Sequence, residues 1–167
     1  MIKYLLVPFL VVLEYFVHRF LGGWLLFDPL LVLALVYAVL HYLEMRPVVI
    51  FALWCGFWQD LTSLGPFSIF MISYGLSALV VAYLTRLMDR HNRVLIFPLV
   101  FVGQILNNHA AFFLNLFLSG TLPYSILFFG RTFLEAVGTT CLAYPVYLLF
   151  RKIDHCVAED EDAASFV

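Results

Sequence analysis

Long apolar segments separated by short polar clusters make up most of this chain, and they limit what it can fold into. A helix that crosses a bilayer needs about 20 largely apolar residues in succession. Hydrophobic residues make up 64% of the 167 residues and charged residues only 12%, whereas water-soluble proteins carry about 25% charged residues. The sequence therefore predicts an all-α polytopic membrane protein with six transmembrane helices, at residues 4–22, 27–43, 47–61, 66–87, 94–118 and 123–150.

The prolines support these boundaries. Six of the seven prolines lie within the first few residues of a predicted span, where a residue without an N–H group costs the helix nothing. Only Pro145 lies well inside a span, near the end of the sixth. We therefore expect a kink between Leu142 and Pro145.

The basic residues indicate how the spans are oriented. Segment 47–61 is short for a span and could instead form a re-entrant hairpin. Cytoplasmic loops near span ends are enriched in Lys and Arg, and a re-entrant segment would send the basic loop at 86–93 to the opposite side. We therefore predict six spans with both termini in the cytoplasm and Asp60 near the outer face. This arrangement places Arg19 outside and seven basic residues inside, namely Lys3, Arg46, Arg86, Arg90, Arg93, Arg151 and Lys152.

The two ends of the chain differ in character. Residues 1–155 are expected to form one membrane domain, and residues 156–167 a short acidic cytoplasmic tail, in which Glu159 to Asp162 are solvated and disordered. The apolar start resembles a signal peptide, but Glu14 interrupts it and no small-residue cleavage site follows. The first segment is therefore predicted to be a retained span.

Asp60 is the most informative single residue. It ends a run without charged residues that begins at Val48, and a turn-forming set from Thr62 to Pro66 follows it. The carboxylate could simply be hydrated at the membrane boundary. Alternatively it is a fixed acceptor that pins the loop or docks a partner, because ionisable groups near membrane depth are costly. In the second case we expect it to accept hydrogen bonds from backbone N–H groups of the turn from Thr62 to Gly65.

Three charged residues lie within the predicted spans. Arg131 and Glu135 are four residues apart, so they share a helix face and can form a local ion pair. Glu14 has only His18 near it on its own face, and it could instead reach Arg131 across helices. A structural polar cluster is the favoured interpretation, and a proton or substrate site and a partner-docking site are the alternatives.

The fifth segment carries a second polar patch of Gln104, Asn107, Asn108 and His109. Gln104 and Asn108 lie on one helix face and can form hydrogen bonds between helices, which is the usual way in which membrane helices accommodate amide side chains. A structural role is again favoured.

Motifs of known chemistry do not occur in the sequence. The five histidines and three cysteines have no metal-ligand spacing, and neither a G-x-S-x-G elbow nor a Gly-rich phosphate loop is present. A net charge of -2 gives no electrostatic reason to expect nucleic-acid binding. We therefore expect a protein that is not an enzyme and has no cofactor, catalytic residue or metal site.

One stretch resembles a known family. The sequence GFWQDLTSLGPFSIFMISYGLSALVVAYL is similar to the central signature of MreD, a family of bacterial rod-shape-determining membrane proteins. The positions that match the family pattern are Gly56, Asp60, Gly65, Tyr83 and Leu84. The stretch FDPLLVLALVYAVL is similar to the second helix of the family, and FRKID resembles its basic C-terminal end.

The resemblance implies a non-enzymatic scaffold of the cell-elongation machinery in the bacterial inner membrane. Such a protein binds MreC and helps to organise the wall-synthesis glycosyltransferase and transpeptidase complex, with the MreB filament as an indirect partner. The resemblance also implies a fold similar to the substrate-binding S components of energy-coupling-factor transporters. An S-component-like subunit of a vitamin-type transporter is therefore the alternative function, and it would need a polar ligand cavity that opens outward.

Overall fold

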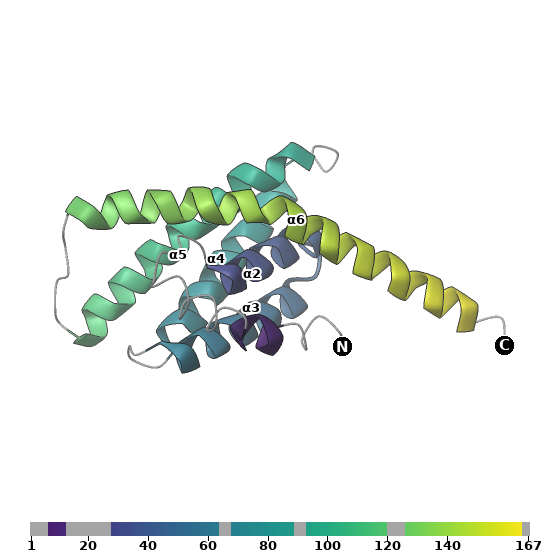
Figure 1. Ribbon diagram of the computed structural model, residues 1–167, viewed down its shortest axis with the longest axis horizontal. Helices are drawn as coiled ribbons and strands as arrows, with labels where there is room; N and C mark the ends of the chain where they lie inside the picture. Colours follow the sequence, from purple (N-terminus) through teal and green to yellow (C-terminus); the bar gives the residue numbers. More distant parts are fainter. Residues whose placement is uncertain (1–6, 13–27, 64–67, 89–92, 120–125, 165–167) are drawn as a thin grey trace.

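The computed structural model describes residues 7–12, 28–63, 68–88, 93–119 and 126–164 (Figure 1). Over these ranges the chain is helical and contains no strand. Most of the first predicted span lies outside the described residues, together with Glu14 and Gly65. Residues 7–12 of that span are helical. The described helices are α2 (Pro29–Leu40), α3 (Met45–Thr62), α4 (Ile69–Leu87), the 3-10 helix η1 (Arg93–Leu95), α5 (Ile96–Ser119) and α6 (Ile126–Ala164).

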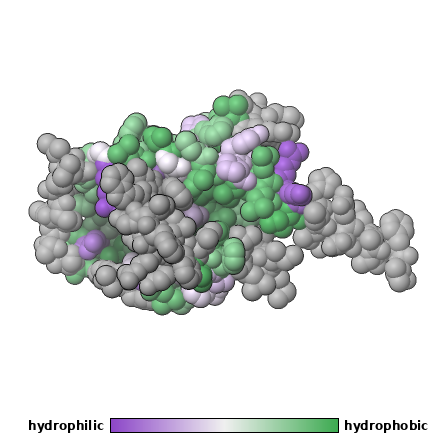
Figure 2. Space-filling view, viewed as in Figure 1, coloured by the Kyte–Doolittle hydropathy of each residue, from purple (hydrophilic) through white to green (hydrophobic). Residues whose placement is uncertain are grey.

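Three of these helices are long and apolar enough to cross a membrane. They are α4, residues Ile96–Leu118 of α5, and residues Phe128–Ile153 of α6. Large apolar side chains are also exposed along them, and apolar residues dominate much of the described surface that is visible in Figure 2. A bilayer, but not water, would tolerate so large an apolar surface. The chain is therefore an all-α membrane protein, as predicted.

Helix α2 forms the centre of the bundle. All residues from Leu30 to Ala38 are buried, and α2 contacts α3, α4, α5 and α6. Its 12 residues reach only about 18 Å at 1.5 Å per residue, which is less than the hydrocarbon core of about 30 Å. Helix α2 is therefore shorter than the predicted segment 27–43, and it is enclosed by other helices instead of facing lipid along its length.

An aromatic cluster joins α2 to its neighbours. The ring of Tyr37 on α2 lies 4.4 Å from that of Phe51 on α3 and 6.1 Å from that of Phe150 on α6. All three side chains are buried. Edge-on and tilted ring contacts of this kind contribute about 0.5–1.5 kcal/mol each beyond their buried area. They fix the C-terminal part of the α6 span against the central helix.

Helix α6 extends beyond the predicted sixth span. It contains Pro145, and its axis bends along its length in Figure 1, as expected where a proline removes one backbone hydrogen bond. The helix continues to Ala164, so the acidic stretch from Glu159 to Asp162, which was expected to be disordered, is part of α6. Helix formation propagates readily from an existing helix, and Ala and Glu, which are frequent in this segment, favour it.

Candidate functional site

Asp60 links the end of α3 to the beginning of α4. Its Oδ1 accepts a hydrogen bond from the backbone N–H of Phe70 at 3.0 Å, and its Oδ2 accepts one from the N–H of Met71 at 2.9 Å. Only 3% of the residue is exposed. The first N–H groups of a helix have no partner within the helix and carry a partial positive charge. Asp60 therefore caps α4 from a different helix and brings a negative charge to its positive end.

The local sequence explains why this cap comes from a distance. The residue at the N-cap position of α4 is Ser68, which has a left-handed backbone with φ of 78° and makes no side-chain cap bond. A serine in the usual extended conformation would satisfy one of these N–H groups itself. Asp60 takes over that role at α4 and satisfies two N–H groups at once.

Gly56 allows the two helices to approach closely enough for this bond. A Cβ atom at position 56 would lie 2.5 Å from Cα of Met71 and 2.6 Å from the backbone oxygen of Phe70. Gly56 and Asp60 are one helical turn apart, so they face the same side of α3. The glycine removes the steric obstacle, and the aspartate forms the bonds that the close approach makes possible.

The described partners of the Asp60 carboxylate lie on α4, and of the turn that was predicted to donate to it only Thr62 and Ser63 are among the described residues. The turn residues that the structure describes complete the C-terminus of α3 instead of donating to the carboxylate. Thr62 Oγ1 donates to the carbonyl of Gln59 at 3.0 Å, and Ser63 Oγ donates to the backbone carbonyl of Asp60 at 3.2 Å. The last carbonyls of a helix need such donors, and this leaves the Asp60 side chain available for α4.

Tyr83 is not part of this joint. It lies on α4 more than three turns after Phe70, and 55% of it is exposed. Among the residues of the family-like stretch, the structure brings Gly56 and Asp60 together against the start of α4 and leaves Tyr83 on the outer surface.

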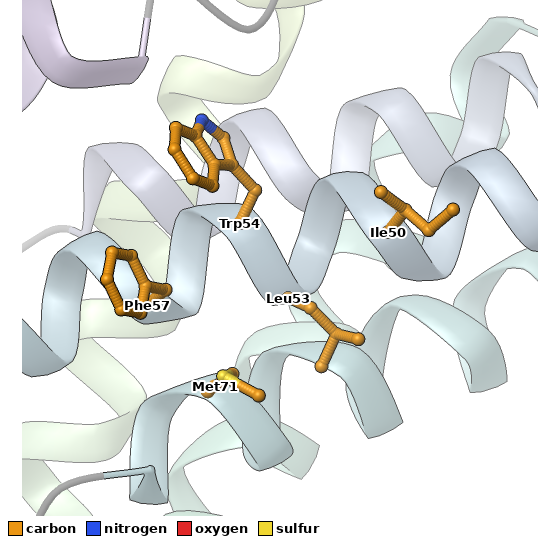
Figure 3. Close-up of a pocket in the computed structure, with 5 residues that line it drawn as sticks. All are labelled: Ile50, Leu53, Trp54, Phe57 and Met71. Atoms are coloured by element: carbon orange, nitrogen blue, oxygen red, sulfur yellow. The ribbon is translucent and has the colours of Figure 1, made fainter.

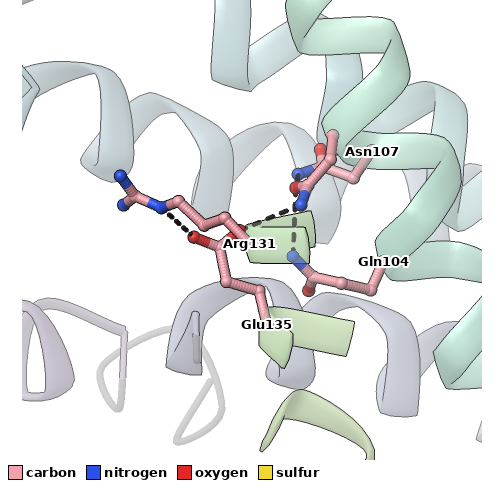
Figure 4. A network of polar contacts seen from close by, with 5 residues as sticks. Gln104, Asn107, Arg131 and Glu135 are labelled. Atoms are coloured by element: carbon pink, nitrogen blue, oxygen red, sulfur yellow. Dashed lines mark hydrogen bonds and ion pairs between the residues drawn. The ribbon is translucent and has the colours of Figure 1, made fainter. Parts of the chain in front are cut away.

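A second polar site joins α5 to α6 (Figure 4). Arg131 Nε donates to Glu135 Oε1 at 2.7 Å, as the four-residue spacing predicts. Asn108 Nδ2 donates across the helix interface to Glu135 Oε2 at 2.9 Å. Within α5, Gln104 Nε2 donates to Asn108 Oδ1 at 3.1 Å. The amides and the ion pair, which the sequence suggested separately, therefore form one network.

Glu135 fixes the direction of every bond in this network. A carboxylate can only accept, so Asn108 must turn its NH2 group toward Glu135 on α6. Its side-chain oxygen then faces the neighbouring amide side chains of α5. Gln104 and Asn107 then donate to that oxygen. In the described part of the chain, Gln104 Oε1 and Asn107 Oδ1 consequently remain buried without a hydrogen-bond partner.

A further buried polar contact has no counterpart in the sequence predictions. Asp28 caps α2, with its Oδ1 accepting from the N–H of Leu31 at 3.0 Å. The hydroxyl of Tyr74 on α4 donates to Asp28 Oδ2. Tyr74 is fully buried, and a buried tyrosine hydroxyl needs a partner. The aspartate before Pro29 was a recognisable N-cap signal, but only the packing of α2 against α4 identifies its second partner.

The groove beside the Asp60 joint is apolar. It has a volume of about 460 Å³ and is lined by Ile50, Leu53, Trp54, Phe57 and Met71. Figure 3 shows Leu53 pointing from α3 toward α4, with Met71 near the start of α4. These side chains offer surface for an acyl chain or an apolar helix face and no polar group for a vitamin-like ligand.

The geometry defines a class of protein but not a reaction. Among the described residues, no group of three or more His, Cys, Asp or Glu side chains could hold a metal ion. The chain is an all-α membrane protein in which a buried carboxylate fixes one helix pair and an amide and ion-pair network fixes another. No protein-family model matches the chain, and comparisons with known proteins and with solved structures give no match.

Proposed function

We propose that this protein is a non-enzymatic scaffold of the MreD type in the bacterial inner membrane. It binds MreC and thereby helps to place the wall-synthesis glycosyltransferase and transpeptidase complex over the MreB filament. Asp60 carries the proposal, because both of its oxygens are committed to backbone N–H groups of α4. Its role is to hold a helix pair in place for partners to bind.

A transporter would use such a residue differently. A carboxylate that binds a substrate or a coupling ion needs an oxygen that can exchange its partner, and Asp60 is buried with both oxygens engaged. The neighbouring groove is apolar, whereas an S-component-like subunit requires polar groups that face its ligand. Both observations favour the scaffold over the transporter.

The proposed topology has six spans with both termini in the cytoplasm. Reporter fusions after Asn92 and after Ile153 are expected to report the cytoplasm, and a fusion after Gly65 the outside, because seven basic residues then lie on the cytoplasmic side. An alkaline phosphatase and fluorescent protein pair at each site measures this. A signal from outside the cytoplasm at Asn92 would contradict the six-span arrangement.

Co-purification tests the function itself. The tagged protein is expressed with MreC from the same source, extracted in mild detergent and purified, and MreC is expected to elute with it at comparable molar amounts. A tagged single-span protein of similar abundance serves as the control for trapping in detergent micelles. If MreC is absent and subunits of an energy-coupling-factor transporter elute instead, the transporter alternative is the correct one.

A further inference from the structure

The outward side of α6 is the least covered surface among the candidate spans. Only 22% of its span is buried, compared with 44% for α4 and 39% for α5. Four exposed residues follow one another on this side at spacings of four, three and four, namely Gly130, Leu134, Val137 and Cys141. We call these four residues the α6 seam. Such a spacing places them in one line, which is the geometry by which two helices pack at a shallow angle.

Arg131 follows Gly130 and lies beside the N-terminal end of the α6 seam. Its Nε is held by Glu135, but its side chain is 75% exposed. Figure 4 shows the two terminal nitrogens pointing away from the amide side chains of α5. The Glu135 bond thus orients a guanidinium whose free edge faces outward. Such an edge matches a carboxylate or phosphate in a two-point contact.

Gly130 is a second observation that bears on what covers this side of α6. A Cβ atom at Gly130 would meet nothing within 4 Å, so none of the described residues requires a glycine there. A glycine inside a helix costs about 0.5–1 kcal/mol relative to alanine. At membrane helix contacts, glycine allows two backbones to come close together. An acyl chain would pack equally well against an alanine, so Gly130 favours a helix over lipid as the occupant.

We propose that the α6 seam docks a membrane-spanning helix of another protein, with a carboxylate on that helix pairing with Arg131. Arg131 lies three residues inside the span that begins at Phe128, which is about 4.5 Å along the axis. The carboxylate therefore lies within the first turn of the partner's span at the same membrane face. The ion pair between this carboxylate and Arg131 flanks the α6 seam, as charged residues at e and g positions flank the apolar a and d positions of a coiled coil.

A second copy of this chain packed symmetrically through the α6 seam is disfavoured. Symmetric packing through the α6 seam would bring two Arg131 side chains toward each other. Glu135 of each copy already pairs with its own Arg131 and Asn108, so its charge is largely compensated before the two copies meet. The inference requires only a membrane-spanning partner, and it holds whether or not that partner is MreC. Failure of the MreC experiment and failure of this one are therefore distinguishable.

The test places a photo-crosslinking amino acid at Leu134 in the full-length protein in native membranes. Leu76 on α4 is the control site, since it is similarly exposed, at 54% against 52% for Leu134. We expect a protein adduct at Leu134 and not at Leu76, with the partner peptide identified by mass spectrometry. That peptide is expected to belong to a spanning segment with Asp or Glu in its first turn at the corresponding membrane face.

Charge exchange then tests the pairing. Arg131→Gln and Arg131→Glu are expected to lower the adduct yield about tenfold or more, as for other truncated charge pairs at interfaces. Arg131→Glu combined with exchange of the partner's acid for Arg is expected to restore the yield, which a misfolded protein could not do. Adducts with lipid alone, with a second copy of this chain, or with a helix that lacks the acid would overturn the proposal. So would an adduct whose yield is unchanged by both Arg131 variants.

Discussion

Replacing Asp60 with alanine is expected to destabilise the protein by about 2–4 kcal/mol, because it leaves the Phe70 and Met71 N–H groups without their acceptors. The start of α4 should then separate from α3 and expose the backbone of both helices. Thermal unfolding of the purified protein in mild detergent, followed by tryptophan fluorescence, measures the change. Membrane abundance should fall in parallel.

Two further variants make this result specific. Asp60→Asn keeps one acceptor oxygen but turns an NH2 group toward the other N–H and loses the charge at the helix end, so its stability should lie between wild type and Asp60→Ala. Ser63→Ala removes only one bond at the C-terminus of α3 and should cost less than about 1 kcal/mol.

The transporter alternative gives a different pattern. A carboxylate that binds a ligand or coupling ion needs its charge, so Asp60→Asn and Asp60→Ala would be equally inactive while both proteins remained abundant. If both variants lose function at normal abundance and still bind MreC, the structural role assigned to Asp60 is incorrect.

Adding a single methyl group at Gly56 is expected to have the second large effect. In Gly56→Ala the new Cβ would lie 2.5 Å from Cα of Met71, and a backbone atom cannot move aside without shifting α4. Overpacking of this kind costs about 1–3 kcal/mol. The shift also lengthens both Asp60 bonds, so the apparent melting temperature and MreC co-purification should fall together.

Gly75→Ala is the matched control for Gly56→Ala. Gly75 is also a buried helical glycine at the contact of α3 and α4, but its nearest neighbour is the Cδ2 of Leu53 at 3.0 Å, the end of a flexible side chain. A small rotation of Leu53 relieves this contact, and alanine favours the helix by about 0.5–1 kcal/mol. Equal losses for Gly56→Ala and Gly75→Ala would show that the close backbone approach at Gly56 is not the cause.

Gly56→Ala and Asp60→Ala affect the same joint, so their losses of stability are not expected to add. Gly56→Ala and Asp60→Ala both separate the start of α4 from α3, so the double variant should be little less stable than the worse of the two single variants. Sites in direct contact commonly show such coupling, of about 0.5–3 kcal/mol. Full additivity would mean that Gly56 and Asp60 act on different parts of the structure.

Much of the local structure could be predicted because it depends on spacing along one helix. Apolar length indicated helices at 66–87 and 94–118, and the structure has α4 and α5 within three residues of those bounds. The four-residue spacing of Arg131 and Glu135 predicted a pair that forms in the structure, and the shared face of Gln104 and Asn108 predicted the side of α5 from which Asn108 bonds to α6. Helical geometry alone places such residues side by side.

Contacts between helices could not be predicted in the same way. Asp60 bonds to residues ten and eleven positions away, and the sequence instead suggested its own turn, because aspartate commonly bonds to nearby backbone. The contact between Asp28 and Tyr74 spans 46 positions. No periodicity in the sequence predicts contacts between residues so far apart along the chain.

The sequence by itself determined that this chain is a helical membrane protein, since so many apolar residues cannot be buried within 167 residues and must face lipid. Only the tertiary structure decided which apolar segment is enclosed by protein. Leu30 to Ala38 of α2 are buried, whereas leucines of α6 such as Leu134, Leu148 and Leu149 are exposed. Lipid and protein interior are both apolar, so hydrophobicity does not distinguish the two environments. Specific contacts do distinguish them, namely the Gly56 approach, the Asp60 cap and the Asn108 bond to Glu135, because each requires two helices to lie in one particular arrangement.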